Sequence, residues 1–306
     1  MSKQVPIPIK TISQYHRMLG LPKPRHPMIS LSRFEDINYH PIQAPKSIVH
    51  NFYSIALKKS FYATLKYGQQ EVDFDEGMLL CMAPMQVLSI EGPQEPANSH
   101  RGLLLLVHPD LLWNTHLAKK IKEYDYFDYQ ANEALHLSEN EEQMLVGIMQ
   151  SIAREYEVNI DEFSQPVIVA QLELLLTYIE RFYKRQFITR KTGHHHILDE
   201  IEALLKDYFD KDDLIVKGIP TVQYLAEAVH LSPNYLSRLL KTLSGHSTQQ
   251  FIQNKLVDKA KEKLSTTDLS VSEIAYDLGF EHPQSFNKLF KKKTHVSPLA
   301  FRQSFN

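Results

Sequence analysis

Two short stretches near the C-terminal end carry polar and basic side chains that could read DNA. Arginine and lysine can donate hydrogen bonds to guanine, asparagine and glutamine can pair with adenine, and serine can do either. Lysines can also neutralise phosphates, which positions a protein on DNA without reading its sequence. This mixture of side chains is typical of a helix that binds in the DNA major groove. The positions expected to face outward are Asn234, Tyr235, Ser237, Arg238 and Lys241 in the first stretch, and Pro283, Gln284, Ser285, Asn287, Lys288, Lys291 and Lys292 in the second.

Both stretches belong to an internal repeat over residues 221–302, and internal repeats are strong evidence of architecture. Each copy reads as a short helix with a small residue, a turn and a second helix, which is the pattern of a helix-turn-helix. The offset of 50 after the turn, against 49 before it, indicates one added residue in the second turn. The matched sets are Val222, Leu225, Ala226, Val229 and Leu231 with Val271, Ile274, Ala275, Leu278 and Phe280, then Leu236, Leu239, Leu240, Lys241, Ser244, Ser247 and Phe251 with Phe286, Leu289, Phe290, Lys291, Thr294, Ser297 and Phe301.

Local signals predict how these helices begin and how they are spaced. Ser232 is a good N-cap, and Pro233 suits the first helical position. Residues 248–264 carry apolar side chains at helical spacing and predict one helix about 25 Å long. Such a helix could hold two reading heads about one DNA turn (~34 Å) apart on the same face.

The formal net charge of −2 at pH 7 hides an uneven distribution. Residues 221–306 contain 11 Lys and Arg against 7 Asp and Glu, a net of +4, whereas residues 194–220 contain 3 against 7, a net of −4. The remaining residues contribute −2. Positive charge is therefore concentrated over the repeat, as phosphate binding requires.

The sequence VSEIAYDLGFEHPQSFNKLFKKKTHVSPLAFR at 271–302, supported by VQYLAEAVHLSPNYLSRLLKTLSGHS at 222–247, resembles the AraC/XylS family of bacterial transcription regulators. His295 stands where the family usually has glycine, as Gly245 does in the first copy; we expect the fold to tolerate it, because histidine accepts a positive φ better than most residues. The resemblance implies base readers at Asn234, Ser237, Arg238, Gln284, Ser285 and Lys288, and we expect phosphate contacts from Lys241, Lys291 and Lys292.

The first part of the chain predicts a β-domain. Residues 1–45 are rich in proline and read as an irregular lead-in. From 48 to about 107, apolar and polar residues alternate in short runs separated by turn residues, which favours a small β-barrel or sandwich. The segments YSIALKK, YGQQEVDFDEG, LLLLVHPDLLW and RFYKRQFITR resemble regulators with a cupin-type sensor domain.

An effector pocket is one expectation for this β-domain. The residues that could line it are Tyr53, Phe61, Tyr67, Phe74 and Met82, although period-two aromatics are ordinary core at least as often. Metal-binding cupins carry a His-x-His near a glycine, and QQEVDFDEG after Gly68 has no histidine. We therefore expect no metal and no cofactor. The three histidines at 194–196 read as a polar connector rather than a metal site.

The middle of the chain predicts helices. Ser138 and Glu141 form a capping box for a helix with Leu145, Met149 and Ile152 on one face. A second helix, 167–187, carries an apolar seam at 4,3 spacing, which suits either internal packing or a homodimer interface. The seam consists of Ile168, Leu172, Leu175, Ile179 and Phe182. Residues 186–196 read as the linker.

The cysteine count, the apolar runs and the absence of common motifs limit the possible classes of protein. The single cysteine, Cys81, excludes an internal disulfide and favours a reducing cytoplasm. We expect no signal peptide, and the longest apolar runs are too short to span a bilayer. The motifs of P-loops, dinucleotide sites and hydrolase nucleophile elbows do not occur.

The predicted architecture is a multi-domain α+β chain: a cupin-like β-barrel with an irregular arm at 1–110, dimerisation helices at 111–190, a linker and leading helix at 191–220, and two helix-turn-helix subdomains at 221–306. The resemblance implies a cytoplasmic, sequence-specific regulator and not an enzyme. Its implied partners are promoter DNA, RNA polymerase, a second copy of the chain and a possible small-molecule effector. Two alternatives stay open: a metal-free cupin-type enzyme fused to a DNA-binding domain, and a constitutive DNA-binding protein without effector.

Overall fold

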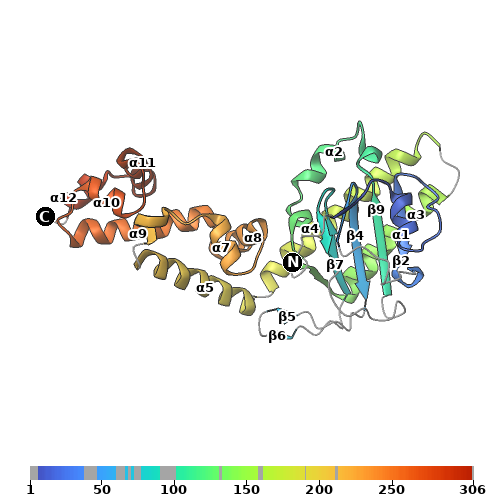
Figure 1. Ribbon diagram of the computed structural model, residues 1–306, viewed down its shortest axis with the longest axis horizontal. Coiled ribbons are helices and arrows are strands. Elements are labelled where there is room, and N and C mark those ends of the chain that lie inside the picture. Colours follow the sequence, from blue (N-terminus) through green and yellow to red (C-terminus); the bar gives the residue numbers. More distant parts are fainter. Residues whose placement is uncertain are drawn as a thin grey trace. The chain divides into compact units, whose positions relative to one another are not determined.

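Two compact units make up the chain, Met1–Gln186 and Phe187–Asn306 (Figure 1). The computed structural model describes residues 6–37, 47–59, 66–67, 70–71, 77–89, 101–130, 133–157, 161–189, 191–210 and 213–304. Each unit has its own core, and each is described separately.

An antiparallel sheet of five strands forms the centre of the first unit, in the order β10-β7-β4-β9-β2 (Figure 1). In β4, Ile55 and Leu57 are buried on one face, as the alternation in the sequence predicts. The run Leu104–Val107 in β9 is buried throughout, because β9 is an interior strand of a sheet covered on both faces. The bounds are β2 (Ile29–Arg33), β4 (Tyr53–Lys59), β7 (Gly77–Met82), β9 (Arg101–Val107) and β10 (Leu135–Leu137).

A smaller sheet and a short helix cover one face of this sheet. Strands β1 (Ile7–Ile9), β3 (Ser47–His50) and β8 (Val87–Ser89) pair in the order β1-β3-β8, with β1 parallel to β3. Helix α1 (Ile12–Met18) packs with them, and β5 (Lys66–Tyr67) pairs separately with β6 (Gln70–Glu71). The resulting core contains Ile9, Ile12, Tyr15, Leu19, Leu21, Ile48, Phe52, Leu104 and Leu106.

The expectation of an irregular lead-in is therefore wrong for residues 7–33, which form β1, α1 and β2. The high proline content was the reason for the wrong prediction. Pro8 nevertheless lies in β1, because β1 is an edge strand, where a missing backbone N–H is tolerated. The described strands form an α+β unit with two facing sheets. Closure into a barrel stays a prediction.

Helices and short 3-10 turns follow the strands. Helix α3 begins with the predicted capping box, in which Ser138 N–H donates to Glu141 Oε2 (3.0 Å) and Glu141 N–H donates to Ser138 Oγ (3.5 Å). The five residues of the apolar seam on α4 are all buried, so the seam packs within the chain. The bounds are η1 (Phe34–Asp36), η4 (Pro109–Leu112), α2 (Leu117–Lys120), η5 (Ile121–Glu123), η6 (Asp125–Asp128), α3 (Glu139–Glu157) and α4 (Ser164–Thr189).

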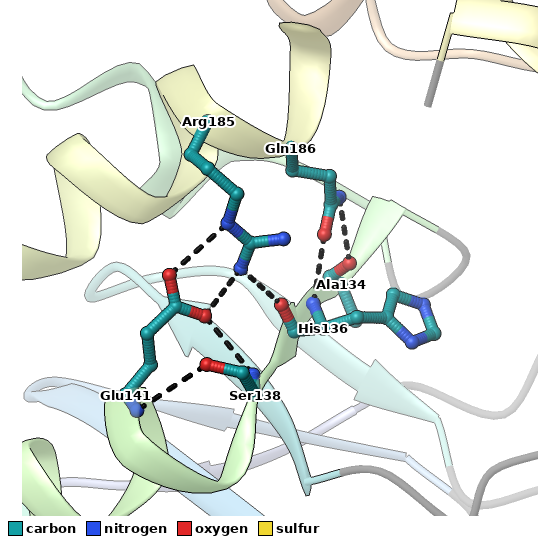
Figure 2. Close-up of polar contacts among 6 residues, drawn as sticks. All are labelled: Ala134, His136, Ser138, Glu141, Arg185 and Gln186. Atoms are coloured by element: carbon teal, nitrogen blue, oxygen red, sulfur yellow. Dashed lines mark hydrogen bonds and ion pairs between the residues drawn. The ribbon is translucent and has the colours of Figure 1, made fainter. Parts of the chain in front are cut away.

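Helical side chains occupy the outer edges of the five-stranded sheet. On β2, the Leu31 N–H donates to the hydroxyl of Tyr156 from α3 (2.7 Å). On β10, the side-chain amide of Gln186 from α4 accepts from His136 N–H (2.8 Å) and donates to the Ala134 carbonyl (3.3 Å), as Figure 2 shows. These contacts satisfy backbone groups that an edge strand would otherwise expose.

The second unit is entirely helical in its described part. Residues 186–189 complete α4 and residues 191–210 form α5, so the linker expected at 186–196 is helical on both sides of residue 190. Helix α9 contacts α5, α8, α10, α11 and α12 and lies between the two heads (Figure 1). The bounds are α5 (Lys191–Asp210), α6 (Asp213–Lys217), α7 (Val222–Ala228), α8 (Pro233–Ser244), α9 (Thr248–Thr266), α10 (Val271–Asp277), α11 (Pro283–Thr294) and α12 (Pro298–Gln303).

Candidate nucleic-acid interface

The first head is a helix-turn-helix built from α7 and α8. Thr221 Oγ1 accepts a hydrogen bond from Tyr224 N–H at the start of α7, and Ser232 Oγ accepts one from Tyr235 N–H at the start of α8. Ala226 on α7 is completely buried, as the close approach of α8 requires. The predicted N-cap at Ser232 is confirmed. Helix α8 ends at Gly245, which has φ 77°.

The second head repeats this frame with α10 and α11. Ser270 and Glu273 form a capping box at the start of α10, and hydrogen bonds from the Ser270 hydroxyl and N–H lower the pKa of Glu273. Ala275 is buried like Ala226. Helix α11 ends at His295 with φ 65°, the left-handed conformation of Gly245, so the expected tolerance of histidine here is confirmed.

The turn of the second head contains a glycine that a side chain could not replace. Gly279 has φ 76°, and a Cβ built there would lie 2.7 Å from the carbonyl oxygen of Leu214 and 3.2 Å from Gly218. At the matching position of the first head, His230 adopts φ 54°. The shared left-handed residue explains how both turns reverse the chain in the same way.

On α8, the expected outward positions divide into three groups. Asn234 and Lys241 are exposed. Ser237 and Arg238 are half-buried, and the Ser237 hydroxyl lies 3.1 Å from the hydroxyl of buried Thr248 on α9. The expectation for Tyr235 is wrong, because its ring is buried and packs edge-on against Phe187 with ring centroids 4.9 Å apart.

On α11, the outward positions are open to solvent. Pro283 is half-buried, and all the others are exposed: Gln284, Ser285, Asn287, Lys288, Lys291 and Lys292. Lys293 is half-buried and donates to Asn254 Oδ1 of α9 (2.8 Å). The second reading helix therefore presents more of its expected contact residues than the first.

Positive charge is available on both reading helices. Within the described part of the chain, Lys241, Lys288, Lys291 and Lys292 take part in no ion pair. Lysines on the connecting helix α9 are instead paired: Lys255 with Glu202 of α5 (2.8 Å) and Lys263 with Asp277 of α10 (3.1 Å). Charge capable of meeting phosphate thus lies on α8 and α11 rather than on α9.

The residues expected to line an effector pocket are not brought together where the structure describes them. Ser54 lies directly opposite Met82 in the β4–β7 pair, so these two side chains share one face of the sheet and Tyr53 points to the other. Tyr53 is buried against the edge of Phe127, with ring centroids 5.0 Å apart. Phe61, Phe74 and the side chain of Tyr67 lie outside the described residues.

The sequence prediction missed two buried residues, of which Phe187 contacts Tyr235 of the first reading helix. Gln186 and Phe187 lie in a segment interpreted as linker, yet both are buried at the end of α4. One sequence signal could have revealed them. By the repeat, Tyr235 corresponds to Ser285, and an aromatic residue in place of an exposed serine indicates a packing partner for the first head alone.

Comparison with known proteins supports this interpretation of the heads. A family model described as a helix-turn-helix domain matches residues 225–304. The chain is 29% identical over 146 residues to the HTH-type transcriptional regulator YfiF of Bacillus subtilis, covering 48% of this chain and 43% of YfiF. It is 26% identical over 160 residues to the regulatory protein PocR of Salmonella typhimurium, covering 48% of this chain and 52% of PocR. Residues 225–304 therefore form a helix-turn-helix domain similar to those of these transcriptional regulators. The resemblance found in the sequence is confirmed.

One relative combines regulation with another activity. The bifunctional transcriptional activator/DNA repair enzyme AdaA of Bacillus subtilis is 34% identical over 100 residues, covering 33% of this chain and 46% of AdaA. The chain spans about half the length of these curated relatives. None of the helices in the described ranges has the length and apolar character needed to cross a membrane.

Proposed function

We propose that this AraC-type chain is a sequence-specific DNA-binding transcriptional regulator. The observation that carries the proposal is the pair of matched helix-turn-helix frames on α9, each with lysines on its second helix that form no ion pair with any residue the structure describes. In this proposal α8 and α11 enter successive segments of a major groove, with Asn234, Ser237, Arg238, Gln284, Ser285 and Lys288 at the bases and Lys241, Lys291 and Lys292 at phosphates. The chain acts as a regulator in the cytoplasm and not as an enzyme.

A pair of substitutions tests the division of labour between bases and phosphates. Arg238→Ala should cost about 1–3 kcal/mol on preferred DNA and little on random DNA, because it removes a base contact. Lys291→Ala should weaken binding to preferred and to random DNA by the same factor, because it removes a phosphate contact. It should also reduce the slope of log affinity against log salt concentration by about 1. Binding titrations over a range of salt concentrations measure both effects.

Lys261→Ala is the matched control, because Lys261 lies on α9 and already pairs with Asp258 (3.1 Å). It should leave the affinity and the salt slope nearly unchanged. Equal losses on preferred and random DNA for both Arg238→Ala and Lys291→Ala would reject the assignment of separate roles.

The second proposed partner is another copy of the chain, bound through α4. The buried seam of α4 is already covered, so the available surface is an apolar stripe beside it. Val167, Ala170 and Leu174 of α4 are exposed. With exposed Phe163, one residue before the helix, they follow one another at spacings of 4, 3 and 4. This spacing suits a coiled-coil contact between two identical helices.

Leu174→Glu tests this interface, because it places a charge at the C-terminal end of the apolar stripe. We expect the wild-type chain to sediment as a dimer and the variant as a monomer at the same concentration. Lys184→Glu, on an exposed part of the same helix away from the stripe, should stay dimeric. A wild-type monomer, or a Leu174→Glu variant that stays dimeric, would contradict the proposal.

The proposal extends to RNA polymerase as a partner and to a small-molecule effector in the first unit, which would act as a cupin-like sensor. An effector can change DNA binding only if it binds two conformations with different affinities. A thermal-shift screen of the full chain against small metabolites tests for the effector. A raised melting temperature together with altered DNA affinity supports a sensor, and a screen without any such compound favours constitutive binding.

A further inference from the structure

The turn of the second head carries glycine where the turn of the first head carries histidine. His230 and Gly279 both have a positive φ, 54° and 76°, and His230 is exposed. His295 ends α11 with φ 65°, so this backbone conformation alone does not require glycine in this chain. Gly279 differs in its surroundings, because a Cβ there would lie 2.7 Å from the Leu214 carbonyl oxygen. The glycine therefore permits a close contact between two backbones.

The segment that this turn touches precedes the first head in the chain. Leu214 of α6 is buried, and its carbonyl oxygen accepts a hydrogen bond from Gly218 N–H (3.0 Å). The Gly218 carbonyl oxygen accepts one from the hydroxyl of Tyr208 at the end of α5 (3.0 Å). We call residues 208–210 and 213–218 the brace. Hydrogen bonds within the brace therefore hold the backbone that the second head contacts.

The brace also contacts the first head. The ring of Tyr208, which is buried, packs edge-on against the ring of Tyr224 on α7, with centroids 5.2 Å apart. Helix α5, which ends in the brace, contacts α8 and lies alongside α9 (Figure 1). Glu202 of α5 pairs with Lys255 of α9 (2.8 Å). One segment thus touches both heads and is itself attached to the helix that connects them.

We propose that the brace fixes the two heads at one separation, so that the chain discriminates between DNA sites by the spacing of their half-sites. Tyr208, Leu214 and Gly279 are the positioning residues. Short non-helical connections at 245–247 and 267–270 join the heads to α9, and such connections are where a head could pivot. The brace gives the heads a second link besides α9. Because its contact with Gly279 is between backbone atoms, no change of rotamer can loosen it.

The consequence for DNA is a strict requirement for one spacing, and this inference rests on the proposed function. One base pair added between two half-sites moves the second about 3.4 Å along the duplex and turns it by about 35°. Heads held by the brace cannot follow this displacement, so one head loses its base contacts. Heads that pivot independently on α9 would follow it and keep most of the affinity.

The test measures how strongly binding depends on half-site spacing. A preferred duplex is first selected from a random pool with the full wild-type chain. Its half-sites are the base pairs whose substitution penalties disappear in Arg238→Ala and in Lys288→Ala. One base pair is then added or removed between them. The wild-type chain should lose at least about tenfold in affinity on either altered duplex, since the loss of a base contact ordinarily costs this much.

Two variants loosen the brace in different ways. Tyr208→Phe keeps the ring against Tyr224 and removes the hydrogen bond to Gly218. Gly279→Ala forces the two backbones apart. In both variants the loss on the altered duplexes should fall from about tenfold to about threefold, because one freed head can follow its half-site. A merely destabilised variant would bind all duplexes more weakly by the same factor, and the ratio between spacings would not change.

Gly245→Ala is the matched control for Gly279→Ala. Gly245 has nearly the same φ, 77°, and a Cβ there meets nothing within 4 Å. The control therefore carries the same backbone strain without displacing a neighbour. It should lose as much affinity on the altered duplexes as the wild-type chain does.

A measurement without DNA separates this inference from the proposed function. Spin labels on cysteines introduced at Ala228 and Glu281, which are exposed in the two heads, report the distance between the heads of the full chain. Cys81 is replaced by alanine in all samples. We expect one narrow distance distribution for the otherwise wild-type chain and a broader one after Tyr208→Phe.

The inference is overturned if the wild-type chain tolerates the altered spacings, if both brace variants keep the wild-type ratio, or if Gly245→Ala relaxes that ratio as much as Gly279→Ala does. A distance distribution that is already broad in the wild-type chain, or that Tyr208→Phe leaves narrow, also overturns it. A wild-type chain without any preferred duplex would overturn the proposed function, and the distance distributions would then decide whether the brace fixes the heads.

Discussion

Equivalent residues in the two heads have different surroundings, and the difference lies in single side chains. Arg238 and Lys288 occupy matching positions, yet Arg238 is half-buried and Lys288 is exposed. Ser237 contacts Thr248, whereas Asn287 at the matching position is open to solvent. The same backbone frame therefore presents one constrained and one open reading surface.

Cys81 provides a test of the first unit at the residue scale. Its thiol is 1% exposed in β7, and burial raises its pKa well above the ordinary value. The thiolate is the reactive species, so we expect the native protein to resist thiol-labelling reagents. Labelling should become rapid and complete in urea. Rapid labelling of the folded chain at pH 8 would contradict the burial of β7.

Sequence reasoning correctly predicted that most of the proposed reading residues face solvent, whereas their contacts with DNA stay a prediction. Asn234, Lys241 and the expected residues of α11 other than Pro283 are exposed. The prediction that Tyr235 faces solvent was wrong. The repeat implies that α8 and α11 expose the same faces, whereas the burial of a side chain depends on which neighbours pack against it. Its partner Phe187 lies outside the repeat and far from Tyr235 in the sequence. The residues around Tyr235 therefore do not predict this contact.

The reading helices also differ at their first turns. Ser232 caps α8 through its hydroxyl, but His282 at the start of α11 makes no side-chain capping bond. The extra residue of the second turn places histidine where the first copy has serine. Helix α11 begins with Pro283 and relies on backbone contacts alone, which leaves it less stable than it could be.

His282→Ser should stabilise the second head by about 0.5–1 kcal/mol, because a serine hydroxyl can accept from the N–H groups of the first turn. The midpoint of thermal unfolding and the amide exchange of α11 measure the effect. The reciprocal variant Ser232→Ala should destabilise the first head by about 1 kcal/mol. Slower unfolding of Ser232→Ala, or faster amide exchange in α11 of His282→Ser, would contradict the capping argument.

Helices were more predictable from the sequence than the strands at the start of the chain. Apolar spacing and caps located α3, α4, the part of α5 after residue 196 and the helices of both heads, because each of these carries its buried face in its own residues. The strand β1 and helix α1 were missed. Their three- and seven-residue lengths give too little periodicity, and their stability comes from β3 and β9, which pair or pack with them from elsewhere in the chain.

The whole molecule combines a β-rich unit with a helical unit, as the composition of its segments predicts. The boundary at Gln186 and Phe187 falls inside α4, where sequence reasoning expected the start of a linker. Because α4 contributes residues to both units, it has apolar side chains on more than one face. It carries the buried seam, the exposed apolar stripe, and buried Gln186 and Phe187 near its end. The pattern of one helix did not reveal which of these faces belongs to which core.

The most direct test of the account is a base-by-base map of the preferred duplex bound to the full chain. Two heads on α9 should produce two clusters of sensitive base pairs on one face of the DNA, with centres about one helical turn (~10 base pairs) apart. Arg238→Ala should erase one cluster and Lys288→Ala the other. A single cluster, or two clusters that both variants weaken equally, would contradict the claim that both heads read DNA.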